Sequence, residues 1–437
     1  MNSDINWLTL VVGVILIARM DLVATGPVCS DDYWPCTCKV VNTSAGVNRL
    51  QIHCDQIRYV GIVKAVFERT PSADVHSFYM TIPETSGSML EYLFQRSIVR
   101  NIYLTCQTDS TIFKINTYSF TSLKNYLESF HIDNCDLRDL SESEWNTFSN
   151  FHFLKSLTFS RTKKFNKDNL KYFPRQWSLT TLNITHSYNF ETLFSHYAVH
   201  EKFPRLVNLV MNYCPNVTTS AEYLEMSLYL LRIGFEIVEM NGNQFSDVDA
   251  ENILKQFSYR SEETLRSFSL RENRLTQLPN IDKFPALAHL RLDNNNFTNE
   301  NFSLAQLNGS RLQTLTLSSC NLKNIKPHAL EVDGDHFQLK LLDLDNNNLT
   351  KFKYSVFKNI LRKMADRWED PGVIHVHRNA FDCDCHLAWL IVDNRHLLRH
   401  VRGARCSDGL AFTKLWPSQF AACNGTSGQL KPRSKHP

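Results

Sequence analysis

The sequence has no large excess of charge of either sign. Its 47 Lys and Arg residues nearly balance its 44 Asp and Glu residues, which leaves a formal net charge of +3 over 437 residues. Binding to nucleic acid or to an anionic membrane surface relies on a marked basic excess, and this sequence gives no sign of one. A composition of 43% hydrophobic and 21% charged residues is instead typical of a folded globular protein.

Long apolar stretches are absent after the N-terminal segment. A membrane-spanning helix needs about 20 consecutive apolar residues, and the nearest later stretch, Tyr223 to Met240, contains four charged side chains. The segment after Cys423 is polar and basic, so it lacks the hydrophobic end of a lipid-anchor signal. We therefore expect no membrane span in the mature chain and a disordered basic tail over residues 424–437.

Familiar catalytic motifs are missing as well. The sequence contains no Gly-rich phosphate loop, no H-E-x-x-H zinc motif and no nucleophile elbow. Its 16 His residues are scattered, and no ordered set of nucleophile, base and orienting group emerges. We expect a protein that is not an enzyme and uses no cofactor, and an independent enzyme is the alternative.

One apolar stretch does occur at the N-terminus, from Trp7 to Ile17, and small residues follow it at positions 24–26. This order is typical of a secretory signal peptide, which we predict over residues 1–26. Asp4 and Arg19 are unusual in such a peptide, and a signal anchor is the alternative, although the stretch is short for a span. We expect a secreted, extracellular protein.

The main feature of the chain is a pattern that recurs about every 27 residues. It reads apolar-x-x-apolar-x-apolar-x-x-Asn-x-apolar, and Cys replaces Asn in some copies. The clearest copies run from Leu265 to Leu275, from Leu287 to Phe297 and from Leu339 to Leu349. A repeat of this period builds a solenoid, in which each unit packs on its neighbours and a long curved binding surface results.

The alternation inside each copy predicts a short strand with one buried face. Strands of successive copies would align in one parallel sheet on the concave side, and the segments 115–123 and 356–361 would form short helices or turns on the convex side. The second apolar residue marks each strand: Leu50, Phe78, Ile102, Phe130, Leu157, Leu182, Leu209, Val238, Phe268, Leu290, Leu315, Leu342 and Ile374. We expect an α/β solenoid with about twelve repeats over residues 58–378.

The Asn of the pattern ends each strand, and we call its place the ladder position. Its side chain is expected to bond backbone groups of neighbouring turns and so keep buried polar groups paired. Cys135, Cys214 and Cys320 fall at this position, and we predict three free, buried and unreactive thiols. Cys106 falls one residue earlier, which predicts an exposed thiol or a bond to an unidentified partner.

Two groups of four cysteines flank the repeats, and each group contains one C-x-C. They lie where the ends of a solenoid must be covered, which favours disulfide caps over the alternative of two zinc sites. Eight N-x-S/T sequons also favour export, and any of them can be used or unused. The sequons begin at Asn42, Asn183, Asn216, Asn296, Asn301, Asn308, Asn348 and Asn424.

These features together resemble extracellular leucine-rich repeat proteins with cysteine-rich caps. The likeness is most specific over residues 379–390, which match N-x-[FW]-x-C-x-C-x-L-x-W-L. The resemblance implies a leucine-rich repeat horseshoe with an N-terminal cap over residues 27–57 and a C-terminal cap over residues 379–423. Carrying over the family's pairing implies four disulfides: Cys29–Cys38, Cys36–Cys54, Cys383–Cys406 and Cys385–Cys423.

The opening of the N-terminal cap, Trp34 to Lys39, also resembles arthropod secreted repeat proteins. Among these is the non-catalytic leucine-rich subunit of oplophorus-luciferin 2-monooxygenase. That likeness implies a role as a non-catalytic accessory subunit of a secreted enzyme complex, a luciferase-like monooxygenase.

Alternation also predicts which side chains line the concave face. In the middle of the chain they are small or neutral: Ser156, Thr158, Ser160, Thr181, Asn183, Thr185, Asn208, Val210, Asn212 and Tyr213. Toward the C-terminus they are charged or titratable: Glu239, Arg271, Glu272, His289, Arg291, Asp293, Asp343, Asp345, His375 and His377. A glycan on Asn183 would shield the middle, so we predict that a partner binds over the charged half.

One small group in that half has the composition of a metal site. His375 and His377 are two residues apart on a strand, so both should point to the same face. The preceding strand carries Asp343 and Asp345 at matching positions, which should bring each His near one Asp. Such a set suits Zn²⁺ or another divalent ion. We nevertheless expect no metal here and favour a solvated face with cross-strand ion pairs, each worth at most about 1 kcal/mol; a metal or pH-sensitive binding site is the alternative.

The sequence therefore predicts a secreted recognition protein that binds an extracellular protein or glycan partner through its concave face. The alternative is the accessory-subunit role that the cap resemblance implies. The ligand and the oligomeric state do not follow from the residues.

Overall fold

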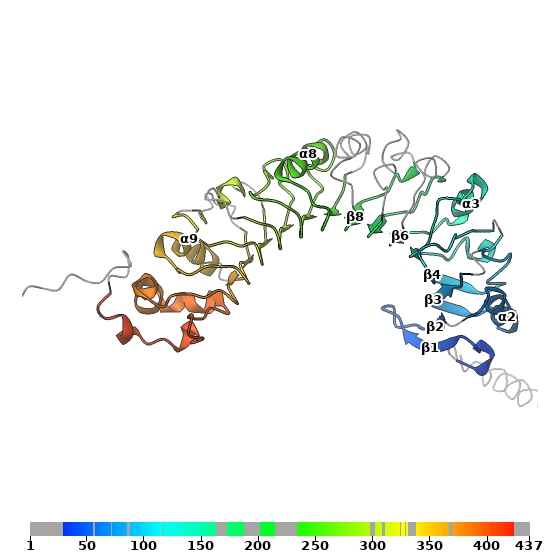
Figure 1. Cartoon of the computed structure of the whole chain (residues 1–437), viewed down its shortest axis with the longest axis horizontal. Helices are drawn as coiled ribbons and strands as arrows, with labels where there is room; N and C mark the ends of the chain where they lie inside the picture. The colour runs from blue at the N-terminus through cyan, green and yellow to red at the C-terminus, as the bar shows by residue number, and fades with distance from the viewer. Residues whose placement is uncertain are drawn as a thin grey trace, which may run out of the picture.

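A computed structural model of the chain forms a curved arc, with strands along its inner edge and helices along its outer edge (Figure 1). Neighbouring strands hydrogen-bond in chain order, as one 15-stranded sheet from β1 to β15. The leucine-rich repeat horseshoe predicted above is confirmed. The structure describes residues 29–55, 57–70, 72–84, 88–116, 118–162, 173–187, 202–214, 234–297, 302–307, 311–323, 325–327, 329–330, 338–366 and 370–423.

The sheet begins with an antiparallel hairpin, and every later strand pair is parallel. The hairpin is β1 (Thr37–Asn42) and β2 (Asn48–Cys54). The repeat strands are β3 (Asp74–Ile82), β4 (Ile98–Cys106), β5 (Ser129–Asp133), β6 (Ser156–Ser160), β7 (Thr181–Thr185), β8 (Asn208–Asn212), β9 (Ile237–Glu239), β10 (Ser267–Ser269), β11 (His289–Arg291), β12 (Thr314–Thr316), β13 (Leu341–Asp343) and β14 (Val373–His375). The last strand, β15 (Val401–Arg402), belongs to the C-terminal cap.

In the part of the chain that the structure describes, several return segments on the convex side contain helices of different lengths (Figure 1). The α-helices are α2 (Gly61–Arg69), α3 (Glu142–Asn146), α8 (Asp247–Ser258) and α9 (Tyr354–Ala365). Shorter helical turns are η1 (Asp31–Tyr33), η2 (Thr121–Leu123), η3 (Thr147–Asn150), η5 (Leu304–Leu307), η6 (Cys385–Leu387), η7 (Trp389–Asp393), η8 (Arg395–His400), η9 (Phe412–Lys414) and η10 (Pro417–Phe420). The helices predicted near 115–123 and 356–361 correspond to η2 and α9.

The strand-marking residues form one continuous row across the sheet. From Phe78 in β3 to Ile374 in β14, each is the register partner of the next. The row spans twelve strands, which matches the expected number of repeats. Leu50 is the exception, because it pairs with Val75 and a register shift then brings Ile52 opposite Phe78. The extra residue is His76 of β3, which has no register partner in β2 at the junction between the cap and the first repeat.

Ladder side chains connect the repeats beneath the sheet. Asn347 is 5% exposed. Its Nδ2 donates to the carbonyls of Leu317 and Leu344, and its Oδ1 accepts the backbone N–H groups of Cys320 and Leu322. Asn243, Asn273, Asn295 and Asn379 also bond backbone groups of neighbouring turns. Buried backbone groups that the short strands cannot pair are satisfied in this way.

Two ladder residues were missed by sequence reasoning because it looked only for Asn and Cys. Thr162 and Ser187 hold the position in successive repeats, and Thr162 Oγ1 donates to Ser187 Oγ over 2.8 Å. Ser187 Oγ in turn donates to the carbonyl of Thr185. A small polar side chain able to reach the backbone therefore suffices at this position.

All four predicted cap disulfides are present. Cys29 bonds Cys38 and Cys36 bonds Cys54 at the N-terminal end. Cys383 bonds Cys406 and Cys385 bonds Cys423 at the C-terminal end. Disulfides of this number point to an oxidising, extracellular type of environment.

A fifth disulfide corrects the prediction for the middle cysteines. Cys135 is not a free thiol, because it bonds Cys106, and Cys106 is 1% exposed. Cys106 points inward because β4 continues two residues beyond Leu104 and keeps its alternation, so Ile102, Leu104 and Cys106 all face the core. Cys214 and Cys320 are buried and belong to none of the five disulfides, as predicted. Burial raises the pKa of the Cys320 thiol to about 12, which keeps it protonated and unreactive.

Several predictions fall outside the described residues. These are the signal peptide over residues 1–26, the tail over 424–437 and the sequons at Asn216, Asn301, Asn308 and Asn424. Within the described residues, none of the helices has the length and apolar character required to cross a membrane. The domain boundaries given above stay predictions.

Candidate binding surface on the concave face

Two rows of side chains run along the concave face. The central row contains the residue that follows each strand-marking residue: Tyr79, Tyr103, His131, Thr158, Asn183, Val210, Glu239, Ser269, Arg291, Thr316, Asp343, His375 and, after Val401 in the cap, Arg402. The flanking row contains the residue two positions later, such as Asp133, Arg271, Asp293, Asp345 and His377. Because the strands are parallel and in register, each side chain of a row lies about 4.8 Å from its neighbour in the same row on the adjacent strand.

The charged half of these rows, from β9 to β14, is organised as acid and base pairs. Arg271 Nε lies 2.9 Å from Asp293 Oδ2, and Arg291 Nη1 lies 4.0 Å from Glu239 Oε1. In each pair the acid is the more buried member, with side chains 9% and 30% exposed against 45% and 44% for the arginines. The carboxylates thus form the floor of the surface, and the arginines are presented to solvent above them.

Asp293 lies on this face but is only 6% exposed. It accepts the hydroxyl of Thr316 over 2.7 Å and the backbone N–H of Ser318 over 2.9 Å, in addition to Arg271. Its predicted place on the concave face is therefore correct, but its role is to orient Arg271. Strand alternation specifies the face of a residue and does not specify how deeply its neighbours cover it.

The Glu272 side chain is hydrogen-bonded by Tyr213, a residue from the middle of the arc that follows β8. Tyr213 Oη donates to Glu272 Oε1 over 2.8 Å, and this bond, with burial, raises the pKa of Tyr213. The Tyr213 ring lies over Gly242, where a Cβ would approach the ring to 2.2 Å. Glycine at that turn therefore makes room for the tyrosine that positions Glu272.

Burial and charge shift two further groups of the predicted surface. Burial and the neighbouring Arg291 lower the pKa of His289, so its imidazole is neutral over a wider pH range than usual. Burial raises the pKa of Asp343 despite the backbone N–H that it accepts from Asp345, and the charges of Asp345 and Asp293 raise it further. His289 therefore adds a neutral polar group between the charged pairs.

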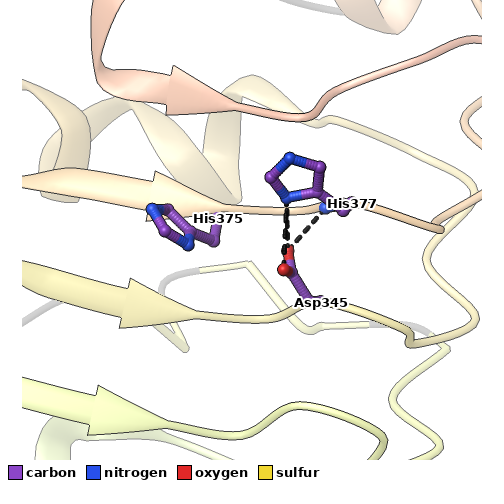
Figure 2. Close-up of side chains that lie close together, drawn as sticks. All are labelled: Asp345, His375 and His377. Atoms are coloured by element: carbon purple, nitrogen blue, oxygen red, sulfur yellow. Dashed lines mark hydrogen bonds and ion pairs between the residues drawn. The ribbon is translucent and has the colours of Figure 1, made fainter.

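The predicted His and Asp group is only partly assembled. Asp345, His375 and His377 place one ligand atom each within 4.8 Å of one another. Figure 2 shows His377 above Asp345 on the neighbouring chain segment, with His375 to one side. Asp343 is the register partner of His375 but is not a member of this group. Three of the four residues predicted to lie together therefore do so in the structure.

The middle of the concave face carries the small neutral side chains predicted for it. Ser156, Thr181 and Thr185 are half-buried on β6 and β7. Asn183 lies on the face at the centre of β7, between Thr158 and Val210. Whether Asn183 carries a glycan stays a prediction, as it does for Asn42, Asn296 and Asn348.

The N-terminal end of the central row is aromatic, and sequence reasoning missed it. The His53 and Tyr79 rings stack with centroids 4.3 Å apart, and Tyr79 stacks on Tyr103 at 4.5 Å. His131 continues the row at 5.7 Å from Tyr103. The signal was available, since each aromatic residue follows a strand-marking residue or its equivalent in the cap.

His131 and Asp133 predict a loss of stability in acid. Burial and Arg161 lower the pKa of His131 below its usual 6.5. Burial alone would raise the pKa of Asp133, but hydrogen bonds from Arg161 and Ser160 outweigh it, and the pKa of Asp133 lies below its usual 3.8. The folded chain therefore binds fewer protons at both groups than the unfolded chain. Their stabilisation is present above about pH 6.5 and is lost as the pH falls through the lower folded values.

We expect the melting temperature to fall between pH 7.5 and pH 5 and to fall again below about pH 4. The variant His131→Gln should show a smaller first fall, whereas His152→Gln, altered at an exposed site, should behave as the wild type. Identical pH profiles for the wild type and His131→Gln would contradict the assignment.

Among the comparisons with known proteins, those with solved structures found distant similarities. No protein-family model matches the chain, and no curated protein matches it. The solved structures include a similar chain in the octameric complex of Latrophilin 3, Unc5D and FLRT2, where FLRT2 is the LRR component. It is 15% identical, with a TM-score of 0.41, over 80% of this chain and 91% of that chain. Human 5T4, a trophoblast glycoprotein, is 16% identical with a TM-score of 0.32, over 68% of this chain and 89% of that chain.

Proposed function

We propose that this protein is secreted and binds an extracellular protein partner through the charged half of its concave face, without catalysing a reaction. The observation that supports this best is the set of acid and base pairs from β9 to β14. In the two arginine pairs, which lie on or just after β9, β10 and β11, a more buried carboxylate lies beside an arginine that solvent can reach.

Fixing the arginines before binding lowers the cost of association. An arginine that is mobile in the free protein loses rotamer freedom on binding, at roughly 0.5–1.5 kcal/mol per side chain. Arg271 is already held by Asp293, and Arg291 lies beside Glu239. Part of the side-chain entropy is therefore lost during folding and not during binding. The guanidinium groups then lie in defined positions for carboxylates or carbonyls of a partner.

The alternation of charge favours a protein over other partners. A polyanion such as a nucleic acid or a sulfated glycan would meet Glu239, Glu272 and Asp345 beside the arginines. Between β9 and β14, the described residues of the two rows include no Trp, Tyr or Phe on which a sugar ring could stack. A protein surface of matching mixed charge fits this arrangement better, because charge complementarity can then be local.

The test begins with cross-linking of the native protein in its source fluid and identification of the captured partner. The affinity of that partner is then measured for the variant Arg271→Ala/Arg291→Ala. We expect binding at least about 10-fold weaker, since arginines at the centre of an interface commonly contribute more than 1 kcal/mol.

The matched control is Arg260→Ala, which removes an exposed arginine from the convex side next to α8. A partner that binds the double variant as tightly as the wild type would overturn the proposed surface. The accessory-subunit alternative predicts a different result, namely a secreted enzyme that co-purifies in constant stoichiometry with this chain.

A further inference from the structure

We propose that Asp345, His375 and His377 form a binding site for Zn²⁺ or a similar late transition-metal ion. Among the described residues, this is the one group of three or more His, Cys, Asp or Glu side chains whose ligand atoms lie within 4.8 Å of one another. It does not depend on the proposed partner surface, because an ion can bind to the free protein.

The distances are close to those that a metal ion requires. In a tetrahedral zinc site with bonds of about 2.0–2.1 Å, neighbouring ligand atoms are about 3.3 Å apart. His377 Nδ1 lies 3.1 Å from each carboxylate oxygen of Asp345, so this pair already has the required separation. The third ligand atom, a ring nitrogen of His375, lies within 4.8 Å of the others. Rotation of the His375 side chain that moves this nitrogen by about 1–2 Å would bring it to a shared ion.

The ligands are supported by groups around them. Asp345 Oδ1 accepts the backbone N–H of His377 over 2.6 Å, and the backbone N–H of Asp345 donates to Asp343 Oδ1 over 2.9 Å. On the other side, Gly403 leaves space for the His377 ring, since a Cβ on Gly403 would approach ring atoms to 2.1 Å. Asp345 and His377 are thus oriented by neighbours on both sides, as in metal sites whose supporting groups fix the ligands.

The donor set selects the class of ion. Two imidazoles and one carboxylate suit zinc and its neighbours, whereas calcium and magnesium prefer oxygen ligands alone. The carboxylate of Asp343 adds favourable negative charge nearby, while Arg402, the register partner of His375, opposes binding. His377 and Asp345 have side chains 52% and 26% exposed, so the fourth position faces solvent and is open to water or to a group on a partner.

The test is titration of the purified, chelator-treated protein with ZnCl₂ by isothermal calorimetry, together with the visible spectrum of the Co²⁺-loaded protein. We expect one ion per chain, with a dissociation constant on the order of micromolar, and a tetrahedral Co²⁺ spectrum. The variants His377→Ala, His375→Ala and Asp345→Asn should each weaken binding by about 10-fold or more. Gly403→Ala should also weaken it, because the new Cβ displaces the His377 ring.

The matched control is His386→Ala. His386 Nδ1 lies 3.1 Å from Asp384 Oδ1, the same separation as in the proposed site, but Lys351 already pairs with Asp384. This variant should bind zinc as the wild type does. The proposal is wrong if the wild type shows no binding, if binding survives all three ligand substitutions, or if His386→Ala abolishes it. Because zinc is the only ligand added, these outcomes are independent of whether the proposed protein partner binds.

Discussion

Replacing Asn347 by alanine is expected to lower the free energy of unfolding of the repeats around β12 and β13 by about 3–5 kcal/mol. The Asn347 side chain accepts the backbone N–H groups of Cys320 and Leu322, each over 3.0 Å, and donates to two buried carbonyls. Alanine removes the side-chain partner of the two N–H groups and of the Leu317 carbonyl, whereas the Leu344 carbonyl still accepts a hydrogen bond from Asn379 Nδ2. Each buried group without a partner costs about 1–3 kcal/mol, and water cannot reach this position because Asn347 is 5% exposed.

The change is measured by chemical denaturation together with hydrogen exchange of the amides in β12 and β13. Asn348→Ala is the matched control, since Asn348 is the next residue, is exposed and donates from its side chain to Asn321. Its backbone N–H to the Leu322 carbonyl is unaffected. We expect a loss under about 1 kcal/mol for the control. Equal losses for the two variants would show that the ladder bonds do not carry the stability of this region.

Removing the internal disulfide with Cys106→Ala/Cys135→Ala is expected to cost about 3–4 kcal/mol. The bond closes a loop with a sequence separation of 29 residues, and the chain-entropy relation gives a value of this size for such a loop. Both sulfur atoms are buried, so the variant also loses packing between β4 and β5. Amides of these two strands should exchange faster, while those of β13 and β14 keep their protection.

Thiol counting separates this disulfide from the free-cysteine prediction. Ten of the 12 cysteines are paired, which leaves Cys214 and Cys320, so the denatured and unreduced protein should give two reactive thiols. The native protein should give none, because both thiols are buried and burial raises the pKa of the Cys320 thiol. The control variant Cys214→Ala/Cys320→Ala should give none even when denatured. Four thiols in the denatured wild type would mean that Cys106 and Cys135 are not bonded.

The row of strand-marking residues shows how much of the fold could be predicted. Buried positions such as Leu157 and Leu290 recur with a regular period, and each strand needs only a local alternation to bury one face. The cap disulfides were available for a similar reason, because cysteine spacing in the C-x-C groups is a local feature of the chain. A sequence pattern that is local and repeated many times can be recognised without knowledge of the contacts between repeats.

The candidate site was less predictable, because its properties depend on contacts between repeats. Alternation placed Asp293 on the concave face, but its burial follows from Arg271 and Thr316 on the two neighbouring turns. Asp345 and His377 met as expected, because both lie at equivalent positions of adjacent repeats. Asp343 did not join them, since joining depends on side-chain direction as well as on register.

The sequence by itself determined the period, and through it the parallel sheet, the curvature and the face on which each strand residue lies. Only the tertiary structure decided where each strand ends and which neighbouring side chains meet. Cys106 illustrates the difference, since the sequence left open an exposed thiol or a bond to an unidentified partner, and two more residues of strand at the end of β4 make it the disulfide partner of Cys135. The physical reason is that alternation is a property of one strand, whereas strand length and side-chain contact arise from pairing between turns about 27 residues apart.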